Sequence, residues 1–202
     1  MRIVILVVCL VLLGPVFAQD AAPSPAATWF APPGTYALDS EAVIVTMTVR
    51  RFLMSPIRAQ FSTVTGGMEV SEAAPGTGAL IVEITAADIA ANGPFVERML
   101  LGGDFLNAEA HPTIAFAAND FAVSDAPTDL LGELDMAGIT HAANFETRLA
   151  GYTMDLETGA LRLRFVAEGD LARGDWGMSA FRGIVGDQVH IRIEADFVQV
   201  VD

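Results

Sequence analysis

Few residues of this chain are of the types that carry out chemistry. The histidines are His111, His141 and His190, and their spacing matches no metal-ligand motif. The chain has no lysine, which excludes Schiff-base catalysis, and it contains neither a Gly-x-Ser-x-Gly segment nor a phosphate-binding loop. Acidic residues are abundant, but no carboxylate pair stands out from an ordinary solvated surface. The sequence therefore predicts no enzyme, no metal site and no cofactor.

The elements that would position any site are strands, because apolar and polar residues alternate with period two in several stretches. In the clearest stretch, 189–197, Val189 and Phe197 share one face with the apolar residues between them, while His190 and Glu194 lie on the other. The same alternation recurs in 43–49, 80–84, 114–118, 134–136, 143–149 and 161–167. This pattern predicts antiparallel strands with one solvated face.

Glycine-containing turns between these stretches indicate that hairpins make most of the connections. The turns lie at 65–67, 75–78, 157–159 and 185–187. The exception is the longer segment 86–107. Within it, 87–91 and 95–101 have helical composition, and Asn92-Gly93-Pro94 separates them. We expect two short helices that lie over one end or one side of the sheet.

Many alternating strands with few helices close most economically into a barrel, because closure removes exposed edges. The predicted fold class is all-β with one or two short helices, as an eight-stranded antiparallel lipocalin-like β-barrel. Its Met and Phe side chains could line a cavity for a linear apolar molecule, or they could pack together as a solid core. An outer-membrane barrel would need aromatic girdles, and two Trp and two Tyr are too few.

The N-terminal segment has the pattern of a secretory signal. Arg2 precedes an apolar run over 3–13, and Val16-Phe17-Ala18 follows. We expect residues 1–18 to be a signal peptide cleaved after Ala18, which predicts a periplasmic or secreted protein. The alternative is a membrane anchor, but the apolar run is too short to span a bilayer.

Cleavage after residue 18 would divide the chain into a linker and one domain. Residues 19–34 are rich in Ala and Pro and are expected to form a linker, and 35–202 are expected to form the barrel. Cys9 would leave with the signal peptide, which excludes a disulfide scaffold, a thiol nucleophile and a thiolate metal site in the mature chain.

The charge of the chain bears on its partners. The net charge is −14, from 25 acidic residues against 11 arginines. Such an excess opposes binding to nucleic acid and to anionic lipid surfaces, so we expect a neutral, cationic or apolar partner. We expect no integral membrane span after signal cleavage, and the sequence leaves a homodimer open.

Several short motifs occur in order along the chain. They are Tyr36-Ala37-Leu38-Asp39, Asp104-Phe105-Leu106-Asn107, His111-Pro112-Thr113-Ile114-Ala115-Phe116, Gly132-Glu133-Leu134-Asp135-Met136-Ala137-Gly138-Ile139-Thr140, Arg173-Gly174-Asp175-Trp176-Gly177-Met178 and Val185-Gly186-Asp187-Gln188-Val189. Their order and spacing resemble the YceI-like family of secreted lipocalin-like barrels that bind polyisoprenoids and related amphiphiles. The resemblance implies the same barrel and an apolar or amphiphilic ligand.

The chain departs from the family pattern at several polar positions. Ala42-Val43 stands in place of His-Ser, Met47 in place of Phe, Arg51 in place of His and Ala59 in place of Gly. Residues 96–100 read Val-Glu-Arg-Met-Leu in place of Arg-Asp-x-His-Leu. These changes indicate a divergent member with a changed ligand or none.

Two sets of polar residues have both a functional and a structural interpretation. Arg173, Asp175 and Trp176 could gate the mouth of the barrel, with Trp176 over a ligand. We favour a structural corner in which the two charges hold a turn and Trp176 plugs one end. Arg51 follows the alternation of the inward-pointing residues. It could bind a ligand head group, pair with an acidic residue or point away from the barrel. For Arg51 we favour a surface role.

We therefore predict a secreted or periplasmic, non-catalytic binding protein. It would hold a hydrophobic or amphiphilic molecule inside the barrel, of polyisoprenoid, isoprenoid-quinone or fatty-acyl type. The alternative is a structural or protein-interaction barrel with a filled core and no ligand. The candidate ligand-binding residues are Met47, Val49, Phe61, Leu100, Phe105, Ile114, Phe116, Met136, Phe145, Phe165, Trp176 and Met178.

Overall fold

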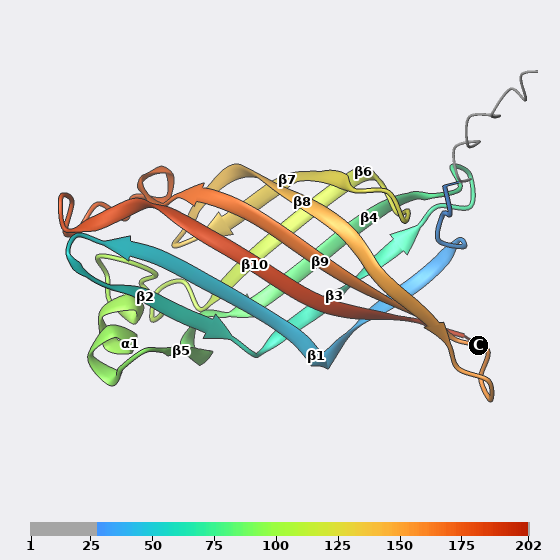
Figure 1. Ribbon diagram of the computed structural model, residues 1–202, viewed down its shortest axis with the longest axis horizontal. Coiled ribbons are helices and arrows are strands. Elements are labelled where there is room, and N and C mark those ends of the chain that lie inside the picture. The colour runs from blue at the N-terminus through green and yellow to red at the C-terminus, as the bar shows by residue number, and fades with distance from the viewer. Residues whose placement is uncertain (1–27, 202) are drawn as a thin grey trace, which may run out of the picture.

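A computed structural model describes residues 28–201, and the expected signal peptide lies outside them. The described chain is dominated by strands that wind around one elongated interior (Figure 1). The elements in order are β1 (Gly34–Arg51), β2 (Met54–Phe61), β3 (Val64–Val70), β4 (Thr77–Thr85), η1 (Ala86–Asp88), β5 (Ile89–Ala91), α1 (Pro94–Leu101), β6 (Thr113–Ala122), β7 (Thr128–Met136), β8 (Ile139–Met154), β9 (Leu161–Ala172), η2 (Arg173–Trp176) and β10 (Val185–Gln199).

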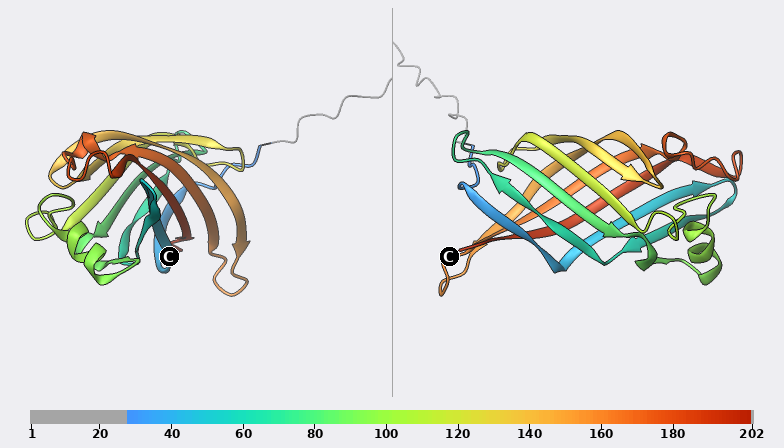
Figure 2. Two further views of the ribbon diagram at one scale, coloured as in Figure 1. Left: turned by 60° about the vertical axis from the view of Figure 1, so that its left-hand side comes forward. Right: turned by 180° about the vertical axis from the view of Figure 1, so that it is seen from behind.

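The sheet closes on itself through β1, which has a partner on both sides. Strand β10 pairs with it antiparallel from Tyr36↔Gln199 to Arg51↔Val185. On its other side β1 pairs first with β3 and then with β2, so β2 and β3 act as one bent strand interrupted at 62–63. Counting them as one and β5 as an extension after β4, the predicted closed eight-stranded antiparallel barrel is confirmed (Figure 2).

The alternation of side chains explains why the interior is apolar. In β10, Val189, Ile193 and Phe197 point into the barrel, while His190 and Glu194 are exposed on the outside. The same inward parity holds along the other strands, because a slip by one residue would bury a polar face. The period-two pattern therefore identified the inner wall of the barrel.

Asp196 lies on the outer, polar face of β10 but is buried. Asp196 is only 2% exposed because two arginines of β9 cover it. Arg164 donates from Nε to Asp196 Oδ1 at 2.7 Å, and Arg162 donates to Oδ2 at 3.2 Å. Arg162 also donates to Asp39 at 2.6 Å, which ties β1 to this group. The hydrogen bonds from Arg164 and Arg162 lower the pKa of Asp196 below its usual value.

The turn expected at 65–67 is wrong, because these residues lie inside β3. Gly66 pairs with Val82 of β4 and has a φ of 145°. A Cβ at this position would collide with the carbonyl oxygen of Ile81. Glycine is therefore required here by the close approach of two strands and not by a change of chain direction.

The first of the two expected helices, at 87–91, is also wrong. Residues Ile89–Ala91 form β5, which pairs with β2 through Phe61↔Ile89, and only the preceding Ala86–Asp88 forms a single 3₁₀ turn. The edge of β2 that faces away from β1 has unpaired backbone groups. Hydrogen bonds to these groups favour a strand at 89–91 more than the modest helix propensity of alanine favours a helix. The second expected helix is confirmed as α1, which begins at Pro94 after Gly93.

The chain before β1 packs on the barrel from residue 28 onward. Ala31 is buried and its N–H donates to the carbonyl oxygen of Val123 at 2.9 Å. The ring of Trp29 stacks on Tyr152 with centroids 4.8 Å apart. The last residues of the expected linker therefore contact the domain. In residues 28–201, we find no helix whose length and hydropathy would suit a bilayer crossing.

Candidate functional site: an apolar cavity inside the barrel

The inward side chains enclose a cavity of about 190 Å³. Thr147 and Arg173 are the polar residues among those that line it, and every other lining residue is apolar. Thr147 donates from Oγ1 to the carbonyl oxygen of Thr128 at 2.8 Å, so its hydroxyl is already hydrogen-bonded. A wall of this kind binds by removing apolar surface from water and selects for shape more than for polar groups.

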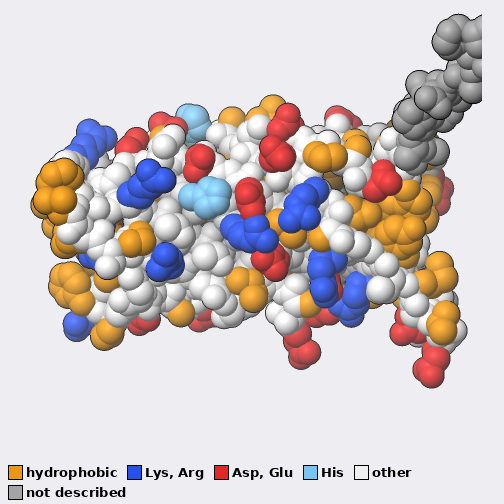
Figure 3. Space-filling view, viewed as in Figure 1, with side chains coloured by type: hydrophobic (Ala, Val, Ile, Leu, Met, Phe, Trp, Pro, Cys, Tyr) orange, Lys and Arg blue, Asp and Glu red, His pale blue; other side chains and the backbone are white. Residues whose placement is uncertain are grey.

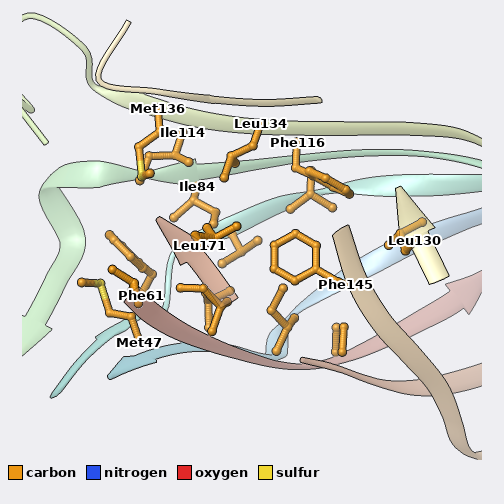
Figure 4. Close-up of a pocket in the computed structure, with 18 of the residues that line it drawn as sticks. Met47, Phe61, Ile84, Ile114, Phe116, Leu130, Leu134, Met136, Phe145 and Leu171 are labelled. Atoms are coloured by element: carbon orange, nitrogen blue, oxygen red, sulfur yellow. The ribbon is translucent and has the colours of Figure 1, made fainter. Parts of the chain in front are cut away.

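The residues expected from the sequence come together around this space, with one exception. All of the candidates except Trp176 line the cavity, and they come from β1, β2, α1 and the chain after it, β6, β7, β8, β9 and the chain after η2. Met47 and Phe61 face Ile114 and Met136 across the interior (Figure 4). Whether these side chains contact a ligand stays a prediction.

Trp176 lies outside the cavity in a structural position. Its side chain is 2% exposed, and Nε1 donates to the carbonyl oxygen of Leu134 on β7 at 3.1 Å. The edge of the ring also meets His141 on β8, with centroids 5.5 Å apart. Trp176 therefore holds η2 against the β7–β8 hairpin.

Arg173 forms the corner differently from the expected pairing with Asp175. Asp175 is exposed, and no ion pair joins the two within residues 28–201. The guanidinium of Arg173, 4% exposed, donates instead to the carbonyl oxygens of Gly186 at 2.9 Å, Met178 at 2.6 Å and Val185 at 3.3 Å. Burial lowers the pKa of Arg173 from its usual value. Carbonyl groups and not a carboxylate hold this charge.

The candidate residues were only part of the lining. Leu80, Val82 and Ile84 on β4 were not among them, although they share the same period-two signal. Leu106 gave no such signal, since it lies in the irregular chain after α1, where its N–H donates to the carbonyl oxygen of Leu100 at 3.0 Å. Leu100, Phe105 and Leu106 all line the cavity.

The size of the cavity limits what it can take without rearrangement. Pockets for drug-sized ligands usually measure about 300–1,000 Å³, while an apolar cavity of about 150 Å³ can hold one benzene molecule. At about 190 Å³, this cavity has room for a short or thin apolar group. Met47, Met68 and Met136 are in its wall, and unbranched thioethers can change rotamer to admit a longer chain.

Similar sequences and structures agree with this architecture. Protein YceI of Escherichia coli (strain UMN026) is 24% identical over 166 residues, which cover 81% of this chain and 86% of that protein. The UPF0312 protein of Pseudomonas aeruginosa (strain LESB58) is 22% identical over 166 residues, with the same shares covered.

Solved structures show the same fold at low identity. BcnA of Burkholderia cenocepacia matches with a TM-score of 0.68 and 15% identity over 79% of this chain and 98% of its own. A polyisoprenoid-binding domain from Saccharophagus degradans, implicated in plant cell wall breakdown, matches with a TM-score of 0.60 and 13% identity over 82% and 98%. The model of the YceI-like domain matches residues 36–197, which is the barrel from β1 to β10. The chain belongs to the YceI-like family.

Proposed function

We infer that this protein holds one apolar or amphiphilic molecule inside its barrel without transforming it. The observation that carries this proposal is the cavity itself, whose polar residues Thr147 and Arg173 both already have hydrogen-bond partners within the protein. Burial of apolar surface contributes about 25 cal/mol per Å² before the entropic costs of binding. Affinity would therefore come from the chain of the ligand, and an isoprenoid or fatty-acyl chain fits this chemistry.

Family membership supports the same proposal, since the Saccharophagus degradans domain of this fold is described as polyisoprenoid-binding. We propose that the protein acts after export to the periplasm or beyond, on the basis of the signal pattern in residues 1–18. N-terminal sequencing of exported protein tests this part, and a mature chain that begins at Gln19 is the expected result.

The decisive experiment is native mass spectrometry of protein exported and purified without detergent. One bound apolar molecule per chain is expected, and solvent extraction then identifies it. The same spectrum reports whether the protein is a monomer or the homodimer that the sequence left open. Protein that is empty and also fails to take up isoprenoid and fatty-acyl probes would refute the proposal and favour a filled barrel that acts through its acidic surface.

A pair of variants localises binding to the interior. Ala167 on β9 lines the cavity, whereas Ala142 on the neighbouring β8 is exposed on the outside. Ala167→Leu should weaken uptake of a fatty-acyl probe because leucine occupies part of the cavity, and Ala142→Leu should bind as the wild type does. Equal binding by both variants would place the ligand elsewhere.

A further inference from the structure

A surface pocket of about 470 Å³ lies beside the apolar cavity and collects arginine side chains. Its residues come from the end of β1 and the turn after it, from η2, from the chain before β10 and from the start of β10. They are Arg50, Arg51, Phe52, Arg173, Arg182, Gly183, Ile184, Val185, Gly186 and Asp187, and we refer to them as the arginine pocket. The β1–β2 turn and the loop before β10 meet at one end of the barrel, opposite the C-terminus (Figure 1).

The charge of the arginine pocket is opposite to that of the whole protein. It has four arginines and one acidic residue, Asp187, in a chain of net charge −14. On the face seen in Figure 3, basic and apolar side chains lie at this end, and most acidic side chains lie toward the middle and the other end. A local excess of positive charge in a concave site attracts anions even when the net charge is negative.

Within residues 28–201, the four arginines have no carboxylate partner, unlike three arginines of the barrel wall. Arg162, Arg164 and Arg192 each pair with an acidic residue on the barrel wall. In the part of the chain that the structure describes, no arginine of the pocket has a carboxylate oxygen within 4.0 Å. The one acidic residue of the pocket, Asp187, forms no ion pair in residues 28–201, and its Oδ1 accepts a hydrogen bond from the Gly174 N–H at 3.2 Å.

Donor groups remain for a bound anion. A guanidinium has five N–H groups, and the three hydrogen bonds of Arg173 to carbonyl oxygens leave two of them over. Arg51 donates from Nε to the carbonyl oxygen of Ser55 at 2.7 Å, which leaves its terminal N–H groups available to an acceptor. Guanidinium groups bind carboxylate and phosphate through two parallel hydrogen bonds, so this donor set suits an oxyanion.

The arginine pocket and the cavity adjoin each other. Arg173 and Val185 line both of them. Apolar side chains of the arginine pocket, Phe52 and Ile184, are exposed, and the Phe52 N–H donates to the carbonyl oxygen of Ile184 at 2.9 Å, which joins the two loops. A molecule with an apolar chain and a charged end would find a matching environment for each part within one continuous region.

We propose that the arginine pocket binds the oxyanion group, a carboxylate or a phosphate, of an amphiphile whose apolar chain lies in the cavity. This inference rests on the proposed function and names the chemical class of the ligand. It also reduces the volume that the ligand needs inside the cavity of about 190 Å³, because the head group lies outside it. Inorganic phosphate would offer the same oxyanion without a chain, and the experiment distinguishes the two.

The test compares two probes that share one apolar chain, the fluorescent fatty acid cis-parinaric acid at pH 7, which carries a carboxylate, and its methyl ester, which is uncharged. Wild-type protein should bind the acid about tenfold tighter than the ester. The double variant Arg51→Gln/Arg182→Gln should lose this preference while its affinity for the ester is unchanged, which also reports an intact cavity. The matched control Arg58→Gln/Arg148→Gln removes two exposed arginines outside the pocket and should keep the preference.

Each other outcome has a defined meaning. Wild-type protein that binds acid and ester equally, or a double variant that keeps the preference, would overturn the arginine pocket as a head-group site and leave the proposed function standing. Failure of the wild type to bind either probe would overturn the head-group site, and it would overturn the proposed function as well if the purified protein were empty and took up no isoprenoid probe. The last measurement is calorimetric titration with inorganic phosphate. If phosphate binding depends on Arg51 and Arg182 while the wild type shows no preference for the acid over the ester, the pocket is a site for free anions and the proposal is overturned.

Discussion

A cavity-filling substitution provides a direct physical test of the interior. Ala167 is 7% exposed, points into the barrel from β9 and lies between Thr147 on β8 and Ile193 on β10. Leucine adds three carbon atoms, and burying them at about 0.8 kcal/mol each gives about 2.4 kcal/mol. Ordering the leucine side chain costs about 0.5–1 kcal/mol. If the space is empty, Ala167→Leu should stabilise the protein by about 1.5–2 kcal/mol.

The assay is thermal unfolding of protein freed of lipid. For a domain of this size, the expected gain corresponds to a rise in Tm of about 3–8 °C. Ala142→Leu is the control, and its exposed position should change the free energy of unfolding by less than about 0.5 kcal/mol. A loss of about 1–3 kcal/mol in Ala167→Leu would mean that the interior is already packed, and it would refute the reasoning.

Three further substitutions test the parts that hold the barrel. Asp196→Asn should cost about 1–2 kcal/mol at pH 7. The pKa of Asp196 is lower in the folded state, so the stability that its carboxylate contributes is present above the unfolded pKa and is lost as the pH falls through the folded pKa. In urea unfolding, the difference in stability between Asp196→Asn and the wild type should therefore shrink below about pH 4. Trp176→Phe should cost about 1–3 kcal/mol in the same assay, since the Leu134 carbonyl loses its donor, and an unchanged midpoint would contradict this. Gly66→Ala should cost more than about 3 kcal/mol, whereas Gly159→Ala, with a φ of 74° but open space around it, should cost about 1–2 kcal/mol; similar losses would refute the close-approach argument.

The strands were predictable because their side chains alternate against one buried face. That signal is local, and it placed Met47, Phe116, Phe145 and Phe165 toward the interior. It failed at β5, because a strand of three apolar residues is too short to define a period and its pairing partner is distant in sequence. It also failed at Gly66, since composition cannot distinguish a turn from a strand that another strand approaches closely.

The roles of polar residues were harder to predict because they depend on neighbours that only the fold supplies. Arg173 and Asp175 are two positions apart, which suggested a pair, yet Arg173 points to carbonyl oxygens of the chain between residues 178 and 186. Asp196 had the parity of a solvated residue, but arginines on the adjacent strand cover it. For Arg173 the expected partner was wrong, and for Asp196 the expected exposure was wrong.

The net charge illustrates the same difficulty and bears on the ligand. A value of −14 led to the expectation of a neutral, cationic or apolar partner, as if the charge were spread evenly. Many acidic residues lie along the wall, where Arg162, Arg164 and Arg192 pair with some of them, while the arginine pocket gathers Arg50, Arg51, Arg173 and Arg182 from three separate segments. A ligand bound as we propose would meet the local field and not the total, so the charge at this end of the cavity, and not the net charge, would decide which head groups the protein accepts.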